Sequence, residues 1–167
     1  MRVHSANPAT RPVFGPPTRR VRREISLISI AFAATALVAA PTAMADTTEN
    51  LRAAVAEARG AACGPLRSNP VIDQAAAAIN KTTDQWINNE ARAVPETDAL
   101  PLLKDLGYDG SHAAILSGAA SPDAQAIKAV LLQGYAKIPD CSYSAYGVSA
   151  MYNAKKQLTL TTVVLAG

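Results

Sequence analysis

The segment CSYSAYGVSAMYNAKKQLTLTTVVLAG, from Cys141 to Gly167, determines the β part of the fold. Its first half alternates larger residues such as Tyr146 and Val148 with small or polar ones, and the half that begins at Gln157 also alternates. Successive side chains of a strand point to opposite faces, so this pattern predicts two strands. The sequence NAKK, residues 153–156, separates them. The segment is therefore expected to form a β-hairpin.

The cysteine that opens this segment has one potential partner. The chain contains two cysteines, and the other is Cys63. Outside the reducing cytosol such a pair forms a disulfide, which here would close a loop of about 80 residues and contribute about 4 kcal/mol. The alternative, a reactive thiol, needs a nearby base, and the flanking sequences AACGP and PDCSY offer none. We therefore expect a Cys63–Cys141 disulfide.

The N-terminal region has the three parts of a secretory signal peptide. RRVRRE is followed by an uncharged, apolar run from Ile25 to Ala40 and then by an A-x-A site that ends at Ala45. The apolar run has sixteen residues, whereas a membrane-spanning helix needs about twenty. We expect a signal peptide over residues 1–45, cleavage after Ala45, and one domain over residues 46–167. A retained membrane anchor is the alternative.

The positive charge of the chain is concentrated in this leader. The net charge is +3, but six of the sixteen Lys and Arg residues precede Ile25. From Asp46 onward ten bases stand against twelve acids, a net charge of −2. A nucleic-acid-binding domain needs a basic face with aromatic residues for stacking, and neither is evident. We therefore expect no nucleic-acid partner.

Two helices are expected in the first half of the predicted domain. The first begins at Asp46, an N-cap with Glu49 three residues later, and ends at CGP, residues 63–65. The second has Asn69 as its cap and Pro70 in its first turn. The apolar face of this second helix consists of Ile72, Ala75, Ala76, Ile79, Thr83 and Trp86. As the only tryptophan and a large apolar group, Trp86 is expected to anchor the core.

The remaining segments complete a layered domain. LPLLKDLGY, residues 100–108, predicts a short helix that ends at Gly107. HAAILSGAA, residues 112–120, predicts a short buried strand, although its periodicity also suits a helix. A third long helix starts at residues 121–123, with an inward face made of Ala124, Ile127, Val130 and Leu131. Helices and strands in this order predict an α+β fold.

Four motifs carry a family resemblance. They are GPLRSNPVIDQAAAAIN at 64–80, LLKDLGY at 102–108, SPDAQAIKAVLLQGY at 121–135, and the hairpin that begins at YGVSAMYN. In this order they resemble secreted CAP domains, the SCP-like family of cysteine-rich secretory proteins, antigen five and pathogenesis-related proteins. The resemblance implies an α–β–α sandwich, with a small antiparallel sheet flanked by helices, and an extracellular site of action.

The chain departs from this family at the cleft, where CAP proteins usually carry two histidines and two acids that can hold a divalent metal. His4 lies in the leader, so His112 is the only histidine of the predicted domain. Tyr135 stands where the family has its second histidine, and no acid stands near Ala113, where it has a glutamate. A zinc site needs three or more converging ligands. We therefore expect no metal, no cofactor and no catalytic residue carried over from the family.

Two other groups of residues invite a functional interpretation. Ser111 and His112 are adjacent, but an activated serine also needs an orienting acid and an oxyanion site; the segment GYDGSH, residues 107–112, is more simply a turn. The second group is aromatic. We expect its members either to pack the hairpin against a helix or to wall an apolar groove, and the groove candidates are Trp86, Tyr135, Tyr143 and Tyr146.

These observations predict a secreted, non-enzymatic, monomeric CAP-like protein of the extracellular space or cell envelope. Its partner would be an apolar ligand of lipid or sterol type, or a macromolecule, with no membrane span left after cleavage. Two alternatives remain. One is a secreted hydrolase with an unrecognised site, which requires a strongly perturbed acid or base in a pocket. The other is a structural or host-interaction protein that uses its surface alone.

Overall fold

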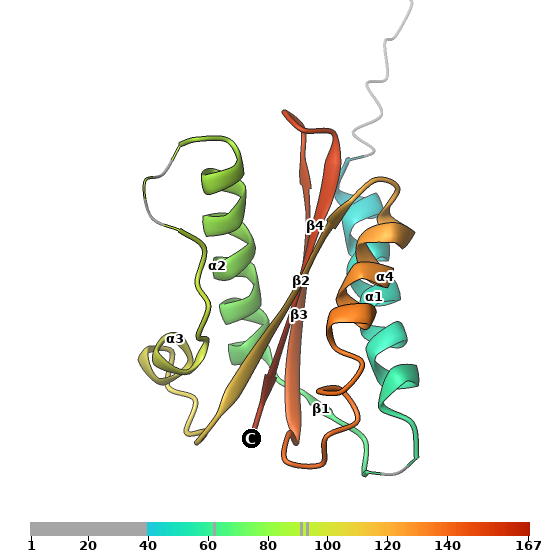
Figure 1. Cartoon of the computed structure of the whole chain (residues 1–167), viewed down its shortest axis with the longest axis vertical. Coiled ribbons are helices and arrows are strands. Elements are labelled where there is room, and N and C mark those ends of the chain that lie inside the picture. Colours follow the sequence, from blue (N-terminus) through green and yellow to red (C-terminus); the bar gives the residue numbers. More distant parts are fainter. Residues whose placement is uncertain (1–39, 62, 91, 93) are drawn as a thin grey trace, which may run out of the picture. The chain divides into compact units, whose positions relative to one another are not determined.

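A four-stranded sheet lies between two layers of helices (Figure 1). The computed structural model describes residues 40–167 with the exception of residues 62, 91 and 93. Residues 1–39 of the predicted signal peptide lie outside the described residues. Within the described part, the arrangement is the predicted α+β fold, with one disulfide.

The C-terminal hairpin forms the centre of the sheet. Strands β3 (Ala145–Asn153) and β4 (Leu158–Ala166) are antiparallel and joined by a turn, in which Asn153 Oδ1 accepts the backbone N–H of Lys156 over 2.7 Å. Strand β2 (Ala113–Ala120) pairs with the other side of β4, also antiparallel. The predictions of a hairpin and of a strand at residues 112–120 are therefore confirmed.

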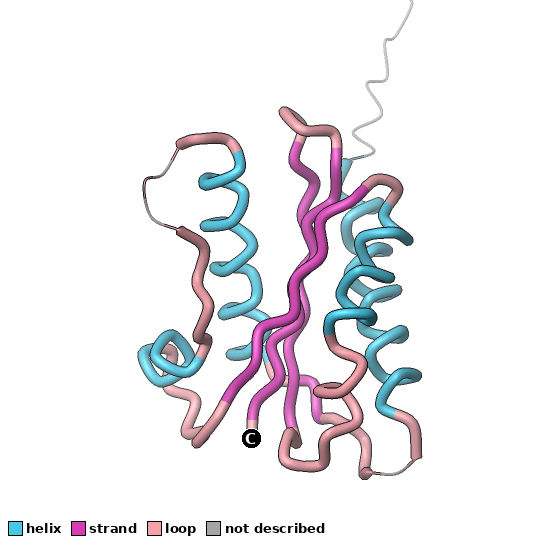
Figure 2. The backbone as a smooth tube through the Cα atoms, viewed as in Figure 1, coloured by secondary structure: helices cyan, strands magenta, loops and turns pink. Residues whose placement is uncertain are grey.

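The two edges of the sheet differ. Strand β1 (Arg67–Ser68) has only two residues and pairs in parallel with the start of β3, so the order of strands is β1-β3-β4-β2. Strand β2 forms the opposite edge and carries no charged residue. There, the side-chain oxygen Oε1 of Gln133 accepts the backbone N–H of Ser117 over 2.5 Å. Figure 2 shows β2 running diagonally across the other strands.

Helix α2 (Pro70–Ile87) covers one face of the sheet. The side chain of its N-cap residue, Asn69, accepts the backbone N–H of Val71 over 2.8 Å, as predicted from Asn69 and Pro70. The buried side chains of α2 that pack on the sheet are Ile72, Ala75, Ala76 and Ile79. At Gly147 of β3 an added Cβ would lie 2.2 Å from the backbone carbon of Ile72. Glycine at this position therefore permits the close approach of helix and strand.

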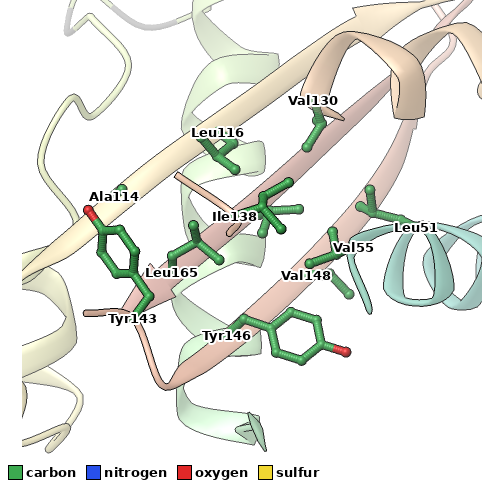
Figure 3. Packing of buried hydrophobic residues seen from close by; sticks show 11 residues of the cluster. Leu51, Val55, Ala114, Leu116, Val130, Ile138, Tyr143, Tyr146, Val148 and Leu165 are labelled. Carbon is green, nitrogen blue, oxygen red and sulfur yellow. The ribbon is translucent and has the colours of Figure 1, made fainter. Parts of the chain in front are cut away.

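Helices α1 (Ala40–Arg59) and α4 (Asp123–Gln133) cover the other face. Their buried residues, including Leu51, Val55 and Val130, pack with Val148 of β3 and its neighbours (Figure 3). None of the described helices is both long and apolar enough to cross a bilayer. Helices α1 and α4 thus enclose a second core on the side of the sheet away from α2.

Two details of these helices differ from the sequence prediction. Helix α1 begins at least as early as Ala40, so Asp46 lies inside the helix and is not its N-cap. On α4, Ala124 is exposed and Ala126 is buried instead. The buried stripe of α4 is therefore rotated relative to the predicted one, and Ala126 packs beside β2. The hydroxyl of Thr161 joins the two elements, because its Oγ1 donates to both Gly118 O and Ala126 O over 3.2 Å.

The expectation for Trp86 is also wrong. Its side chain is 46% exposed, although it belongs to the last turn of α2. The sheet-facing positions of that turn are polar. The side-chain nitrogen Nδ2 of Asn153 donates to Asp84 Oδ1 over 2.7 Å and to Asn88 Oδ1 over 3.1 Å. A polar network thus joins the end of α2 to the hairpin turn, and Trp86 points elsewhere.

Helix α3 (Leu100–Asp105) ends as the sequence predicts. Gly107 adopts a φ of +85°, in the left-handed region that glycine favours. The backbone N–H of Tyr108 then donates to Leu103 O over 2.8 Å, and that of Gly107 donates to Lys104 O over 2.9 Å. These two bonds form a Schellman motif and satisfy the last carbonyl groups of the helix.

Candidate ligand pocket at the disulfide

The predicted disulfide joins the segment after α1 to the segment before β3. Cys63 and Cys141 are bonded, their Cα atoms are 5.4 Å apart, and 78 positions separate them in the sequence. Gly60 reverses the chain after α1 with a φ of +63°, and its N–H donates to Glu57 O over 3.1 Å. This turn directs the chain from the end of the helix to Cys63.

Arg59 connects the same two segments through hydrogen bonds. It is the last residue of α1 and is only 4% exposed. Its Nε donates to Gly64 O over 3.2 Å, and Nη1 donates to the carbonyl oxygens of Ile138 and Asp140, each over 2.7 Å. Its Nη2 donates to Tyr143 O over 2.8 Å. The disulfide and the buried guanidinium of Arg59 therefore hold the same two segments together, the one after α1 and the one before β3.

The turn at residues 140–142, which contains Cys141, has an internal hydrogen bond. Asp140 Oδ1 accepts the backbone N–H of Ser142 over 2.9 Å. This bond lowers the pKa of the Asp140 carboxyl, because it favours the ionised form. Pro139 precedes this turn. Ionised Asp140 thus shapes the turn that presents Cys141 to Cys63.

Two adjoining hollows lie beside the disulfide and share four wall residues. The first has a volume of about 430 Å³, the second about 340 Å³. The shared residues are Arg59, Cys63, Gly64 and Pro65. The walls of the first are completed by Ala56, Gly60, Ala61, Leu66 and Tyr146, and those of the second by Arg67, Cys141, Tyr143 and Ser144. We call these two hollows together the disulfide pocket.

Two of the four predicted groove residues lie in the walls of this pocket. Tyr143 and Tyr146 are 6% and 5% exposed, and both also contact the core between the sheet and α1 (Figure 3). The guanidinium carbon of Arg52 lies 5.8 Å from the centre of the Tyr146 ring. These contacts hold the Tyr146 ring in place as one wall of the pocket.

The structure does not bring the other two groove candidates to this pocket. Tyr135 follows the end of α4 and is 79% exposed, whereas Trp86 belongs to α2 on the opposite face of the sheet. Neither residue contributes to the walls. The four aromatic residues are therefore not gathered around a single groove.

The Ser111–His112 pair makes a contact of its own. Ser111 Oγ lies 3.0 Å from His112 Nδ1, and the His112 ring is 5.1 Å from that of Tyr143, centre to centre. The other ring nitrogen, Nε2, is buried and has no hydrogen-bond partner among the described residues. No described carboxylate hydrogen-bonds to either nitrogen of this ring. The orienting acid of an activated serine is thus not seen at this pair.

The residues compared with the family's metal ligands are dispersed. Tyr135 is exposed beyond α4, and Ala113 begins β2. In the part of the chain that the structure describes, no group of three or more His, Cys, Asp and Glu residues is arranged to hold a metal ion.

Comparison with solved structures identifies a neighbour for this architecture. It is the crystal structure of a cysteine-rich secretory protein from Staphylococcus aureus subsp. aureus Mu50, with a TM-score of 0.52 and 14% sequence identity. The fold is CAP-like. The match covers 74% of this chain but only 38% of that protein, so the chain spans well under half of its neighbour's length. No family model and no curated protein matches the sequence.

Arg59 is a site residue that the sequence analysis missed. It follows Leu51 and Val55 at intervals of four residues, which places it on the buried face of α1. A basic residue in register with an apolar stripe is a signal for a buried guanidinium that is hydrogen-bonded within the fold. Three of its four hydrogen-bond partners, however, lie 79 to 84 residues later, and the local pattern contains no information on them.

Proposed function

We propose that this protein is a secreted, non-enzymatic CAP-like protein that holds an apolar small molecule in the disulfide pocket. The observation that carries the proposal is the first hollow of that pocket, with a volume of about 430 Å³ and walls that include Ala56, Pro65, Leu66 and Tyr146. Ligand pockets of proteins are typically about 300–1,000 Å³ and mostly apolar. The size and walls of this hollow suit a compact apolar body.

Two further observations support the proposal. The Cys63–Cys141 disulfide is compatible with an oxidising environment, as expected for an exported protein. The walls are also held in a fixed position, because the disulfide and Arg59 fasten the loop to the rest of the fold. A pre-formed pocket loses less conformational entropy on binding than a mobile one.

Titration with a neutral, apolar fluorophore tests the proposal. We choose N-phenyl-1-naphthylamine, whose emission increases in apolar surroundings, and the purified, disulfide-bonded protein. Saturable binding of one equivalent is expected. Ala56 is exposed on α1 and belongs to the pocket wall, so the larger side chain of Ala56→Trp should fill the hollow and abolish binding.

The matched control is Ala53→Trp. Ala53 is likewise exposed on α1, one turn earlier, but is not part of the walls. This variant should bind as the wild type does. Equal binding by both tryptophan variants, or no saturable binding by the wild type, would contradict a ligand role for the pocket.

A macromolecular partner is the second candidate, and a specific observation favours it. Leu132 and Tyr135, at the end of α4, are 65% and 79% exposed and lie three positions apart in the sequence. Tyr135→Ala should leave fluorophore binding unchanged, because Tyr135 is outside the pocket. Loss of fluorophore binding in this variant would instead indicate that the ligand site lies at the end of α4.

A further inference from the structure

We infer that the disulfide pocket selects ligands that carry an anionic group, such as a carboxylate, sulfonate or phosphate, on an apolar body. This inference rests on the proposed function, because it names the class of ligand for the same site. Two arginines, Arg59 and Arg67, belong to the walls, and no Asp or Glu does. The walls therefore combine apolar surface with uncompensated positive charge.

The charge of Arg59 is buried without a counter-ion. All four of its hydrogen bonds go to carbonyl oxygens of the backbone, and it forms no ion pair with a described residue. Carbonyl dipoles orient a guanidinium but leave its net charge intact. Burial of an unpaired charge is unfavourable, so an anion that approaches this position relieves part of that cost.

The hydrogen-bonding capacity of Arg59 is also not exhausted. A guanidinium has five N–H groups. Four of them are used: one on Nε, two on Nη1 and one on Nη2. One N–H of Nη2 thus remains without a partner among the described residues, and Arg59 belongs to the walls of both hollows.

Arg67 supplies the second charge, from a different element. It lies in β1, where its backbone N–H donates to Ser144 O over 3.0 Å, and its side chain is exposed at the second hollow. It forms no ion pair within the described part of the chain. The β1–β3 pairing thus places a guanidinium without an ion-pair partner in the walls of the second hollow, and a guanidinium suits the geometry of carboxylate, sulfonate and phosphate.

The acids closest to the pocket in the sequence do not neutralise these arginines. Asp140 precedes Cys141, but its carboxylate forms no ion pair with Arg59 or Arg67; it accepts the backbone N–H of Ser142 instead. Glu57 lies on α1 beside Ala56, is exposed, and does not contribute to the walls. The positive potential at the pocket is therefore left for a ligand to complement.

A pair of matched fluorophores tests this inference. 8-Anilino-1-naphthalenesulfonate has nearly the same aromatic body as N-phenyl-1-naphthylamine, with one sulfonate added. The ratio of the two dissociation constants isolates the contribution of the anion. We expect Arg67→Gln to weaken binding of the sulfonate about tenfold at low ionic strength, since a charge-assisted bond is lost, and to leave the neutral fluorophore unaffected.

Arg92→Gln is the control. Arg92 is also exposed but lies outside the pocket walls, so this variant changes the net charge equally and should leave both dissociation constants unchanged. Added salt should weaken the binding of the sulfonate fluorophore and leave the binding of the neutral fluorophore unchanged. If both fluorophores bind and Arg67→Gln changes their ratio by less than about twofold, the anionic preference is wrong and the proposed function stands. If neither fluorophore binds to the wild type, both the anionic preference and the proposed function are wrong.

Inorganic phosphate distinguishes an amphiphile from a free anion. Phosphate lacks the apolar body, so it should displace the sulfonate fluorophore only at concentrations far above the dissociation constant of that fluorophore. Phosphate that instead displaces the sulfonate fluorophore with equal or greater affinity would identify the pocket as a site for free anions. That result would overturn the inference.

Discussion

The Nη1 atom of Arg59 donates a 2.7 Å hydrogen bond to the carbonyl oxygen of Ile138, which lies 79 residues later in the chain. This bond closes nearly the same loop as the disulfide, which joins positions 78 residues apart. The fold therefore fixes the end of α1 to the start of the hairpin twice, once by hydrogen bonds and once covalently.

We first predict that Arg59→Met is strongly destabilising. The substitution retains apolar volume but removes four hydrogen bonds to carbonyl groups, two of which are buried. The free energy of unfolding should decrease by about 3 kcal/mol or more, since bonds to charged groups are worth about 1.5–3 kcal/mol each and are not additive. Urea denaturation measures the change. Arg92→Met is the control, and a loss below about 1 kcal/mol for Arg59→Met would contradict the structural role.

The second prediction concerns the disulfide. The double substitution Cys63→Ser, Cys141→Ser should lower the free energy of unfolding by about 4 kcal/mol, because the unfolded chain regains the freedom of a loop of 78 positions. Equilibrium denaturation of the oxidised wild type and the variant gives this difference. Reduction of the wild type should shift its transition to that of the variant. Identical transitions in oxidised and reduced wild type would refute the prediction.

The third prediction uses the contact of α2 with β3. Gly147→Ala should cost about 2–4 kcal/mol of stability, because the new Cβ would lie 2.2 Å from the backbone carbon of Ile72 and helix or strand must move. Gly64→Ala is the matched control, since no atom lies within 4 Å of its added Cβ. Thermal denaturation should show a large loss for the first variant alone.

The fourth prediction is a pH dependence at Asp123, whose carboxylate accepts the hydroxyls of Thr159 and Thr47 over 2.6 and 2.5 Å. These bonds lower the pKa of Asp123 in the folded state. The stabilisation is therefore complete above the unfolded pKa of about 4 and disappears as the pH falls through the lower, folded value. Asp123→Asn should be less stable than the wild type near neutral pH, and the difference should shrink in acid.

Urea denaturation of both proteins at neutral and acidic pH measures this difference. Glu96→Gln is a suitable control, because Glu96 is exposed and forms no ion pair with the described residues. A stability difference between wild type and Asp123→Asn that is independent of pH would show that the carboxylate charge is not involved.

The local patterns in the sequence were sufficient for most of the fold. Asn69 and Pro70 mark the start of α2, and Gly107 marks the end of α3, because caps and left-handed turns depend on neighbouring residues only. The alternation in β3 and β4 likewise predicts the hairpin. The α+β architecture follows from the order of these elements.

Tertiary contacts explain what the sequence could not predict. Trp86 continues the apolar stripe of α2, yet the bonds of Asn153 to Asp84 and Asn88 decide which side of that turn faces the sheet. The pocket has the same origin, since its walls combine residues 56–67 with residues 141–146. No periodic pattern in the sequence indicates that these two segments lie side by side. The disulfide could be predicted only because the chain has two cysteines.

The order of the strands has a practical consequence. The disulfide pocket borders β1 and the start of β3, whereas β2 lies at the other side of the sheet, two strands away from β3. The uncharged margin of β2, with Gln133 bonded at Ser117, is thus separated from β1 by β3 and β4. Cross-linkers, fluorescent labels or surface immobilisation can be directed to β2 without obstructing access to the arginines.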